Sequence, residues 1–411
     1  MSSDHSTLHL RPARHEDWQE IITLDARSFA LPAPLPEAEI AEFRTKVAEA
    51  IVVRDESSDG DPLVAVSLYH QLPLTVPGGT AVTSAGLSWV SVTATHRRRG
   101  LLRRMLTEQF RSWHEAGLPL AILTASEGGI YERFGFGPAC YAQSITVDPG
   151  AVHWRTEAPE DSRVRYGTPD QIAAAVPRLH ARWALTRPGA VHRPEEWWSS
   201  ILADRGFRRN SQTSGLYYLL HADGYAAYRM DARESSATVE ELCTVTQQAH
   251  TDLWRVLTGL DLVSSITAKV PVDETLPLSL YDARAVQSTA RTDELWVSIL
   301  DVVAALQART YDVDGTVLLS VTDGWDGREG NYLLEVSDGR ATVQRDPESA
   351  STEGIPRATL GISVLSSMYT GGISARDFAA AGRLDTDSAA TLDLVDALLA
   401  TRRAPFSGTY F

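Results

Sequence analysis

The stretch Trp89–Phe110 (WVSVTATHRRRGLLRRMLTEQF) restricts the possible folds more than any other part of the chain. It begins with Val90 and Val92 alternating with polar residues, which is typical of a strand. It ends with apolar residues at helical spacing, namely Leu101, Leu102, Met105, Leu106 and Phe110. Arg97–Arg99 and Gly100 lie between the two patterns. The sequence therefore predicts a strand that enters a helix through a basic, glycine-containing turn.

A turn of this kind is suited to binding an anion such as a pyrophosphate. The first backbone N–H groups of a helix are unpaired, and the helix dipole attracts negative charge to them. Gly100 would let a ligand approach the backbone closely. The alternative is that Arg97–Arg99 form a solvated, charged helix face. Cations at a helix start oppose the dipole unless an anion neutralises them, so both interpretations stay open at this point.

The order of the expected elements divides the chain into three parts. Residues 1–152 alternate strand and helix patterns, which indicates an α/β layer domain. Residues 153–292 repeat the outline as helix, hairpin, strand and helix, which suggests a duplicated domain. Residues 293–411 begin with an expected long amphipathic helix over Asp293–Arg309 and continue with strands, Gly/Asp-rich turns and short helices, which indicates an α+β domain.

An acid-rich turn, Asp323–Glu329, joins two of the strands expected in the third part. Its carboxylates raise the possibility of a cation-binding loop. The turn lacks the number and spacing of ligands found in calcium loops, so we expect a solvated hairpin turn.

Composition narrows the classes of partner. The formal net charge of −15 disfavours nucleic acid and anionic membrane surfaces and favours cationic ligands. The two cysteines, Cys140 and Cys243, stand far apart in the sequence. We therefore expect neither a disulfide framework nor a cysteine-based metal site, and we expect the protein to reside in a reducing compartment. No stretch approaches the run of about 20 apolar residues that a membrane span needs, and no signal peptide is visible. We therefore expect a soluble, cytoplasmic protein.

Two motifs carry a resemblance to a known family. VSVTATHRRRGLL resembles motif A of the GCN5-related N-acetyltransferases, where Arg97 and Gly100 match the pattern and Leu102 replaces its last small residue. IYERFGF resembles the Tyr-x-x-x-Gly-Phe of motif B, with Tyr131 as its tyrosine. With ELWVSILDVVAALQARTY and the terminal aromatic Phe411, the whole chain resembles the enhanced intracellular survival (Eis) family. The resemblance implies two tandem acetyltransferase-like domains and a sterol-carrier-like domain whose C-terminus returns to the active site.

The resemblance also implies the cofactor and the residues that bind it. The co-substrate would be acetyl-CoA, with no metal. The strand residues Val90, Ser91 and Val92 would hold the pantetheine arm. The turn residues would hold the pyrophosphate, namely Arg97, Arg98, Arg99, Gly100, Leu101, Leu102 and Arg103. Ser126 and Glu127 match further coenzyme positions. The second part lacks an Arg-x-x-Gly where its strand TVEELCTV meets the next helix, so we expect only the first domain to bind coenzyme.

Two residues are expected to carry out the proton transfers. The resemblance implies that Tyr131 is the general acid, and an ordinary phenol remains protonated at neutral pH. It implies that the C-terminal carboxylate, on Phe411, is the general base. The usual pKa of such a carboxylate is low for a base, and burial would raise it. None of the nearby ionisable side chains is a better candidate for the base. These side chains are Glu127, Glu132, His96 and His114.

The resemblance and the acidic charge together predict polycationic amines, such as aminoglycosides, as substrates. Trp18, Phe29 and Phe43 are candidate substrate contacts through cation–π interactions. The family implies a homohexamer. Alternative functions are acetylation of lysine side chains in proteins, or lipid binding by the third domain beside a vestigial acetyltransferase half.

Overall fold

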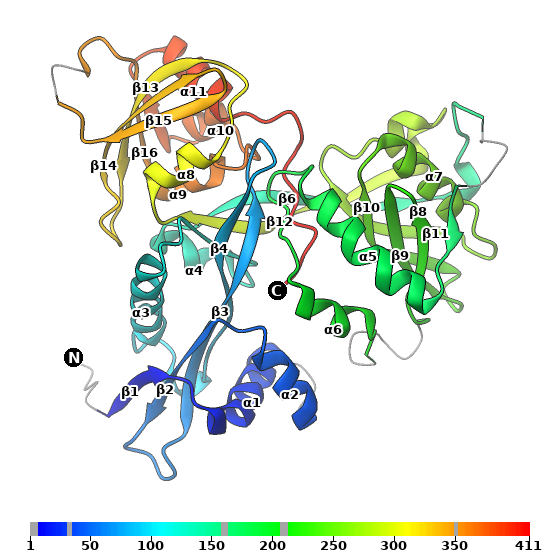
Figure 1. The fold of residues 1–411 in the computed structure, drawn as a ribbon, viewed down its shortest axis with the longest axis horizontal. Helices are drawn as coiled ribbons and strands as arrows, with labels where there is room; N and C mark the ends of the chain where they lie inside the picture. Colours follow the sequence, from blue (N-terminus) through cyan, green and yellow to red (C-terminus); the bar gives the residue numbers. More distant parts are fainter. Residues whose placement is uncertain (1–6, 31–34, 158–162, 206–212, 349–351) are drawn as a thin grey trace.

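A computed structural model describes residues 7–30, 35–157, 163–205, 213–348 and 352–411. Two α/β halves share one long sheet, and a third domain lies beside the first half (Figure 1). The shared sheet has the strand order β1-β2-β3-β4-β5-β12-β6-β11-β10-β9-β8-β7. Among the described residues, no helix is both long and apolar enough to cross a membrane.

The first half places helices on both faces of its strands. The strands are β1 (Leu8–Pro12), β2 (Glu49–Asp55), β3 (Leu63–Thr75), β4 (Ala81–Val92), β5 (Leu120–Leu123) and β6 (Gly137–Val147). The helices are α1 (Trp18–Phe29), α2 (Glu37–Arg44), α3 (Leu101–Glu115) and α4 (Gly128–Tyr131). Alternate residues of β3 point to opposite faces, so that Val66 and Leu68 pack beneath α1 whereas Tyr69 packs beneath α3.

The second half repeats the connection at the centre of the first. Its strands are β7 (Arg165–Tyr166), β8 (Tyr217–His221), β9 (Gly224–Asp231), β10 (Ser236–Thr244), β11 (Ser265–Pro271) and β12 (Val286–Ile299). Its helices are α5 (Pro169–Ala184), α6 (Trp198–Leu202) and α7 (Gln247–Thr258). Helix α7 joins the parallel strands β10 and β11, as α3 joins the parallel strands β4 and β5. The repeated outline predicted from the sequence is therefore present.

The prediction of a long helix over Asp293–Arg309 is wrong. Strand β12 continues to Ile299, pairing with β5 on one side and β6 on the other, and only α8 (Val302–Ala308) is helical. Leu295, Val297 and Ile299 enter one core and Trp296 the opposite one, so the apolar run reflects burial of both faces. Strand β12 also runs across the expected division between residues 292 and 293.

The third domain is a five-stranded sheet covered by helices. The sheet has the order β15-β14-β13-β16-β17, formed by β13 (Gly315–Thr322), β14 (Gly330–Ser337), β15 (Arg340–Arg345), β16 (Arg357–Gly361) and β17 (Leu384–Thr386). Helices α8, α9 (Ile362–Met368), α10 (Ala375–Ala380) and α11 (Ala389–Leu399) complete it. Its core is continuous with that beneath β12.

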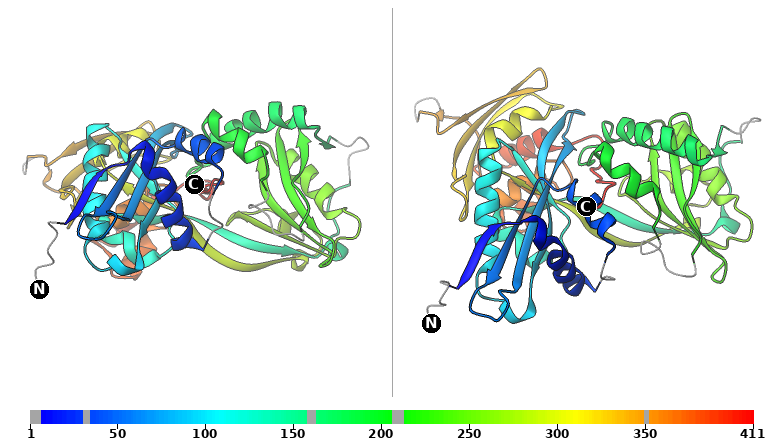
Figure 2. Two further views of the ribbon diagram at one scale, coloured as in Figure 1. Left: turned by 90° about the horizontal axis from the view of Figure 1, so that it is seen from below. Right: turned by 60° about the horizontal axis from the view of Figure 1, so that its bottom comes forward.

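After α11 the chain leaves the third domain and ends between the two halves, as all views show (Figures 1 and 2). Backbone hydrogen bonds hold this terminal segment in place: Phe406 donates to Pro188 over 3.0 Å, and Ser407 accepts from Val191 over 3.1 Å. The terminal segment thus bridges all three parts of the molecule.

Candidate active site

Strands β4 and β5 separate at the centre of the first half. Their parallel pairing covers Ser84–Gly86 and Leu120–Ile122, after which β4 continues to Val92 while β5 ends at Leu123. The register between β3 and β4 also shifts here. Trp89 has a φ of 50°, a left-handed conformation that is costly for a bulky residue. The strand is therefore bent away from its neighbour, which opens a fork in the sheet.

The basic turn lies where the end of β4 meets α3. Arg98 and Gly100 have φ angles of 61° and 75°, so the chain bends sharply before Leu101 begins the helix. A Cβ at Gly100 would meet no atom within 4 Å, so the positive φ, and not crowding, is what favours glycine there. The open backbone at the helix start and the arginines fit an anion such as a pyrophosphate.

A cleft of about 770 Å³ gathers most of the residues predicted to bind the coenzyme. These are Val90, Ser91, Val92, Arg97, Arg98, Gly100, Leu101, Leu102, Arg103, Ser126 and Glu127. Tyr131 and Phe29 line the same cleft, and Arg99 does not. We call this cavity the coenzyme cleft. Its wall includes the fork, the basic turn and the short helix α4.

Tyr131 is buried in this cleft at the end of α4, with 7% of its surface exposed. Burial, assisted by the charge of Glu127, raises the pKa of Tyr131 to about 12. Its hydroxyl group therefore keeps its proton throughout the neutral range and can donate it.

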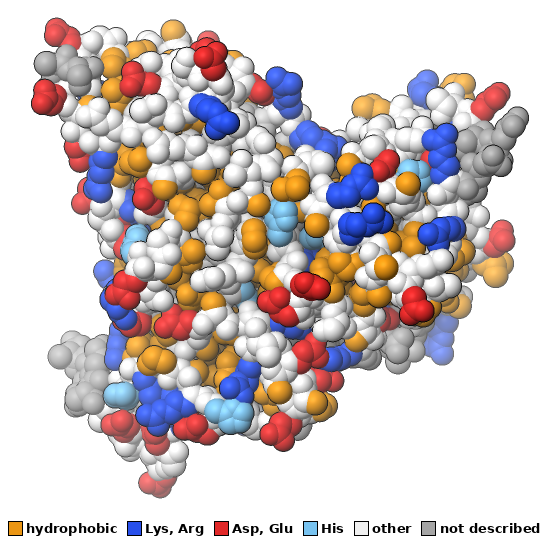
Figure 3. Space-filling view, viewed as in Figure 1, with side chains coloured by type: hydrophobic (Ala, Val, Ile, Leu, Met, Phe, Trp, Pro, Cys, Tyr) orange, Lys and Arg blue, Asp and Glu red, His pale blue; other side chains and the backbone are white. Residues whose placement is uncertain are grey.

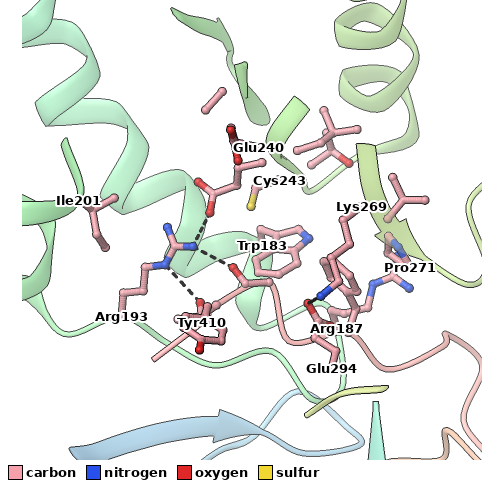
Figure 4. A pocket seen from close by; sticks show the side chains of 18 of the residues that line it. Trp183, Arg187, Arg193, Ile201, Glu240, Cys243, Lys269, Pro271, Glu294 and Tyr410 are labelled. Carbon is pink, nitrogen blue, oxygen red and sulfur yellow. Dashed lines mark hydrogen bonds and ion pairs between the residues drawn. The ribbon is translucent and has the colours of Figure 1, made fainter. Parts of the chain in front are cut away.

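A second cavity, of about 1020 Å³, lies between the two halves and is lined by the terminal segment (Figure 4). We call it the central pocket. Arg193 donates to the carbonyl oxygen of Gly408 over 2.8 Å and to Thr409 Oγ1 over 3.2 Å. Glu294 accepts from the backbone N–H of Ser407 over 2.9 Å, which keeps the segment against the sheet. Figure 4 shows the ion pair between Lys269 and Glu294 in the wall of the pocket.

Phe411 lines the central pocket and reaches the fork. A Cβ on Gly86 would lie only 3.1 Å from Cε2 of Phe411, so the ring packs against β4 at the last residue paired with β5. Phe411 and Tyr131 line different cavities, and consecutive residues of β4 line each of them, Trp89 the central pocket and Val90 the coenzyme cleft.

The three aromatic residues expected to contact substrate are separated. Phe29 lines the coenzyme cleft, and Phe43 lines the central pocket, where its ring stacks on Trp89 at 4.3 Å. Trp18 is buried behind Phe43, with ring centroids 6.0 Å apart, and lines neither cavity. Of the three, Phe43 is therefore the residue that lines the central pocket.

Three residues of this region were missed from the sequence. Trp89 directly precedes the predicted coenzyme strand, which is a signal that could have identified it. Asp25 accepts a hydrogen bond from Ser91 over 3.1 Å, and burial raises the pKa of Asp25 to about 6. His70 donates through Nδ1 to the carbonyl oxygen of Lys46 over 2.6 Å, and burial lowers its pKa. No local pattern marks Asp25 or His70, because their partners come from distant segments.

The corresponding junction of the second half is built differently. Strand β10 leads to α7 through Val245 and Thr246, and the Thr246 side chain accepts from the backbone N–H of Ala249 over 3.2 Å. A side chain of the protein thus occupies one of the first N–H groups of this helix, where an anion would bind in the first half.

Comparison with known proteins agrees with this architecture. Models of GNAT acetyltransferase domains match residues 9–139 and 189–295, and a sterol carrier protein domain model matches residues 302–408. N-acetyltransferase Eis of Mycobacterium tuberculosis is 38% identical over 96% of this chain and 97% of its own length. An uncharacterized N-acetyltransferase of Streptomyces coelicolor is 31% identical over 92% of this chain and 93% of its own.

Among solved structures, Eis1 from Mycobacterium abscessus is similar over 98% of this chain and 100% of its own, with 27% identity and a TM-score of 0.85. The expected fold class, with two tandem acetyltransferase domains before a sterol-carrier-like domain, is therefore confirmed. With a relative of 38% identity along nearly the whole chain, the protein belongs to the Eis family of GCN5-related N-acetyltransferases.

Proposed function

We propose that the protein transfers the acetyl group of acetyl-CoA to an amine that enters through the central pocket. The observation that carries this proposal is the placement of Trp89 and Val90. These consecutive residues of β4 line the central pocket and the coenzyme cleft respectively, so one strand reaches both ligands. Both residues lie at the bend of β4, beyond its pairing with β5.

The residues of the coenzyme cleft fit acetyl-CoA, which supplies an acyl thioester when bound. The turn around Arg98 and Gly100 would hold the pyrophosphate with backbone N–H groups and arginine side chains. The separated end of β4 leaves the backbone of Val90–Val92 available to orient the pantetheine arm. The second half, with its capped helix α7, would have a structural role.

Two groups of the chain would move the protons. Tyr131, protonated across the neutral range, donates its hydroxyl proton to the sulfur that leaves. The carboxylate of Phe411 accepts a proton from the amine that attacks, and the packing of the Phe411 ring against Gly86 of β4 supports this role. The amine nitrogen thereby gains the acetyl group, and the thiol leaves with the proton from Tyr131.

The central pocket favours an amine with a largely apolar body over a polycation. Aromatic side chains surround it, including Phe43, Trp89, Trp183, Trp197 and Phe411. Every acidic side chain that lines it contacts a basic side chain, in the pairs Arg187–Asp273, Arg193–Glu241, Arg229–Glu240, Lys269–Glu294 and His250–Glu274. The acidic net charge therefore does not concentrate here, and acidic and basic side chains are interspersed over the face in Figure 3.

A transfer assay tests the proposal. The full chain is incubated with acetyl-CoA and one amine at a time, and release of free thiol is measured. The panel contains aromatic monoamines, lysine peptides, linear polyamines and aminoglycosides. We expect monoamines and lysine peptides to exceed polycations in kcat/KM. Thiol release no faster than hydrolysis with every amine would overturn the acetyltransferase proposal, whereas a preference for aminoglycosides would overturn only the substrate class.

The homohexamer implied by the family and the cytoplasmic location expected from the sequence remain proposals. Light scattering coupled to size-exclusion chromatography measures the first directly, and a mass other than six chains would exclude it.

A further inference from the structure

The acid-rich turn forms a hairpin between the antiparallel strands β13 and β14, as expected from the sequence, but it is not simply solvated. Arg328 is 4% exposed, and its guanidinium pairs with Asp323 over 2.8 Å. The same guanidinium donates to the Ser298 hydroxyl over 2.9 Å and to the carbonyl oxygens of Ile299 and Phe134 over 2.8 and 3.2 Å. The third domain is thereby fixed to β12 and to the segment that follows Tyr131.

This anchored turn brings Trp325 to the coenzyme cleft. The Trp325 ring packs edge-on against Phe134 at 4.7 Å and against Phe110 at 6.1 Å. The Arg103 guanidinium lies 5.1 Å from the centre of the Trp325 ring, a cation–π distance. Gly324 and Trp325 line the cleft together with Arg103, so its wall includes residues of the third domain.

The order of the lining residues along the chain, from β4 through the turn into α3, indicates which part of the coenzyme would meet Trp325. Val90–Val92 lie at the fork, where the thioester must react, and the turn from Arg97 to Gly100 is the anion site that follows along the chain. Arg103 is one helical turn further on. A coenzyme with its thioester at the fork and its pyrophosphate at the turn extends its nucleotide beyond the turn, towards Arg103 and Trp325.

We propose that Trp325 and Arg103 form a subsite for the adenosine 3′-phosphate end of coenzyme A, so that the third domain takes part in coenzyme binding. This inference rests on the acetyl-CoA site proposed above. The indole supplies an aromatic surface on which a purine stacks, and the guanidinium it holds supplies a planar cation for a phosphate. The indole N–H of Trp325 is buried and has no hydrogen-bond partner among the described residues.

Fragments of the coenzyme separate this role from a purely structural one. Isothermal titration calorimetry on the full chain would use three probes: coenzyme A, adenosine 3′,5′-bisphosphate and 4′-phosphopantetheine. In Trp325→Ala we expect the Kd of the first two to rise about tenfold, the size of one lost base-stacking contact. The Kd of 4′-phosphopantetheine should stay within about twofold of wild type, because that probe does not reach the subsite.

Two further variants guard against a folding effect. Trp325→Leu keeps an apolar side chain against Phe134 but has no aromatic surface, so it should bind the probes as the alanine variant does. Trp154→Ala removes an equivalent contact in the second half, where the Arg255 guanidinium lies 4.5 Å from the Trp154 ring, and should bind all three probes as wild type does.

Equal weakening of all three probes, or none, in both Trp325 variants would overturn the subsite. Failure of the wild-type chain to bind coenzyme A at all would instead overturn the proposed function. The two failures are distinguishable because the wild-type titration is read before any variant is compared.

Discussion

At the scale of single residues, Tyr131 combines burial with a position in the coenzyme cleft. A buried phenol with a pKa of about 12 does not lose its proton at any pH at which the protein is assayed. Tyr131→Phe preserves the packing of the ring but removes the proton. We expect kcat to fall about 100-fold, the lower range for general acid catalysis, with the Kd of coenzyme A nearly unchanged. Steady-state kinetics and titration calorimetry measure the two quantities, and unchanged kcat would remove Tyr131 from the mechanism.

Asp25 makes the stability of the protein depend on pH. Its folded-state pKa of about 6 lies above the ordinary value of 3.8, because burial disfavours the carboxylate. The folded state therefore binds the proton more tightly than the unfolded state, and stability from this group is lost as the pH rises from about 4 to 6. The pKa difference corresponds to about 2–3 kcal/mol.

Asp25→Asn keeps an oxygen for the Ser91 hydroxyl and cannot ionise. We expect this substitution to raise the melting temperature relative to wild type at pH 7.5 and to have little effect near pH 4. Scanning calorimetry at both pH values checks this, with Asp59→Asn, an exposed position, as the control. A difference from wild type that is the same at both pH values would show that Asp25 does not titrate as described.

At the scale of elements, neighbouring arginines of the basic turn carry equal charge but differ in whether they line the coenzyme cleft. Arg97 lines the coenzyme cleft and Arg99 does not. Alanine at either position removes one positive charge from the same turn, so long-range electrostatics change equally. We expect Arg97→Ala to raise the Kd of coenzyme A about tenfold, the range of a lost charge-assisted hydrogen bond, and Arg99→Ala to raise it less than twofold. Titration at one salt concentration decides, and a larger effect at Arg99 would contradict the placement.

The same elements show what local pattern can and cannot predict. The strand, turn and helix from Trp89 to Phe110 follow from alternation, helical spacing and one glycine, all of which are local. Strand β12 does not, because Leu295, Val297 and Ile299 bury one face and Trp296 the other, and their partners in β5 and β6 lie more than 140 residues earlier. The packing of the Asp323–Arg328 turn against the rest of the molecule could not be predicted for the same reason. Its contacts with Phe134 and Ser298 are made only once the domains have packed.

At the scale of the whole molecule, the terminal segment contacts all three domains. Arg193 of the second half and Glu294 of β12 hold Gly408 and Ser407, and Phe411 then reaches the fork of the first half. A Cβ on Gly408 would lie 2.2 Å from the Trp183 ring, so the path of the segment is tightly restricted. The position of its last residue is therefore determined by the packing of the entire chain.

A short Gly-Ser extension after Phe411 tests that position. The added residues convert the terminal carboxylate into an amide and move the charge away from the fork. We expect kcat to fall about 100-fold, as when a general base is lost, while the Kd of coenzyme A stays at its wild-type value. The same extension at the N-terminus serves as the control. Full turnover in the C-terminally extended chain would exclude the carboxylate as base.

Strand β12 comes from the second half but lies between β5 and β6 of the first half, which affects folding during synthesis on the ribosome. Strand β5 ends at Leu123, but the strand that pairs with it is complete only when Ile299 has been made. At 5–20 residues per second, that interval lasts roughly 10 to 35 s. During this time β12 is not yet available to pair with β5, and an unpaired strand edge is the kind of surface that pairs wrongly with other chains. The sheet of the first half can therefore be completed only after β12 of the second half has been made.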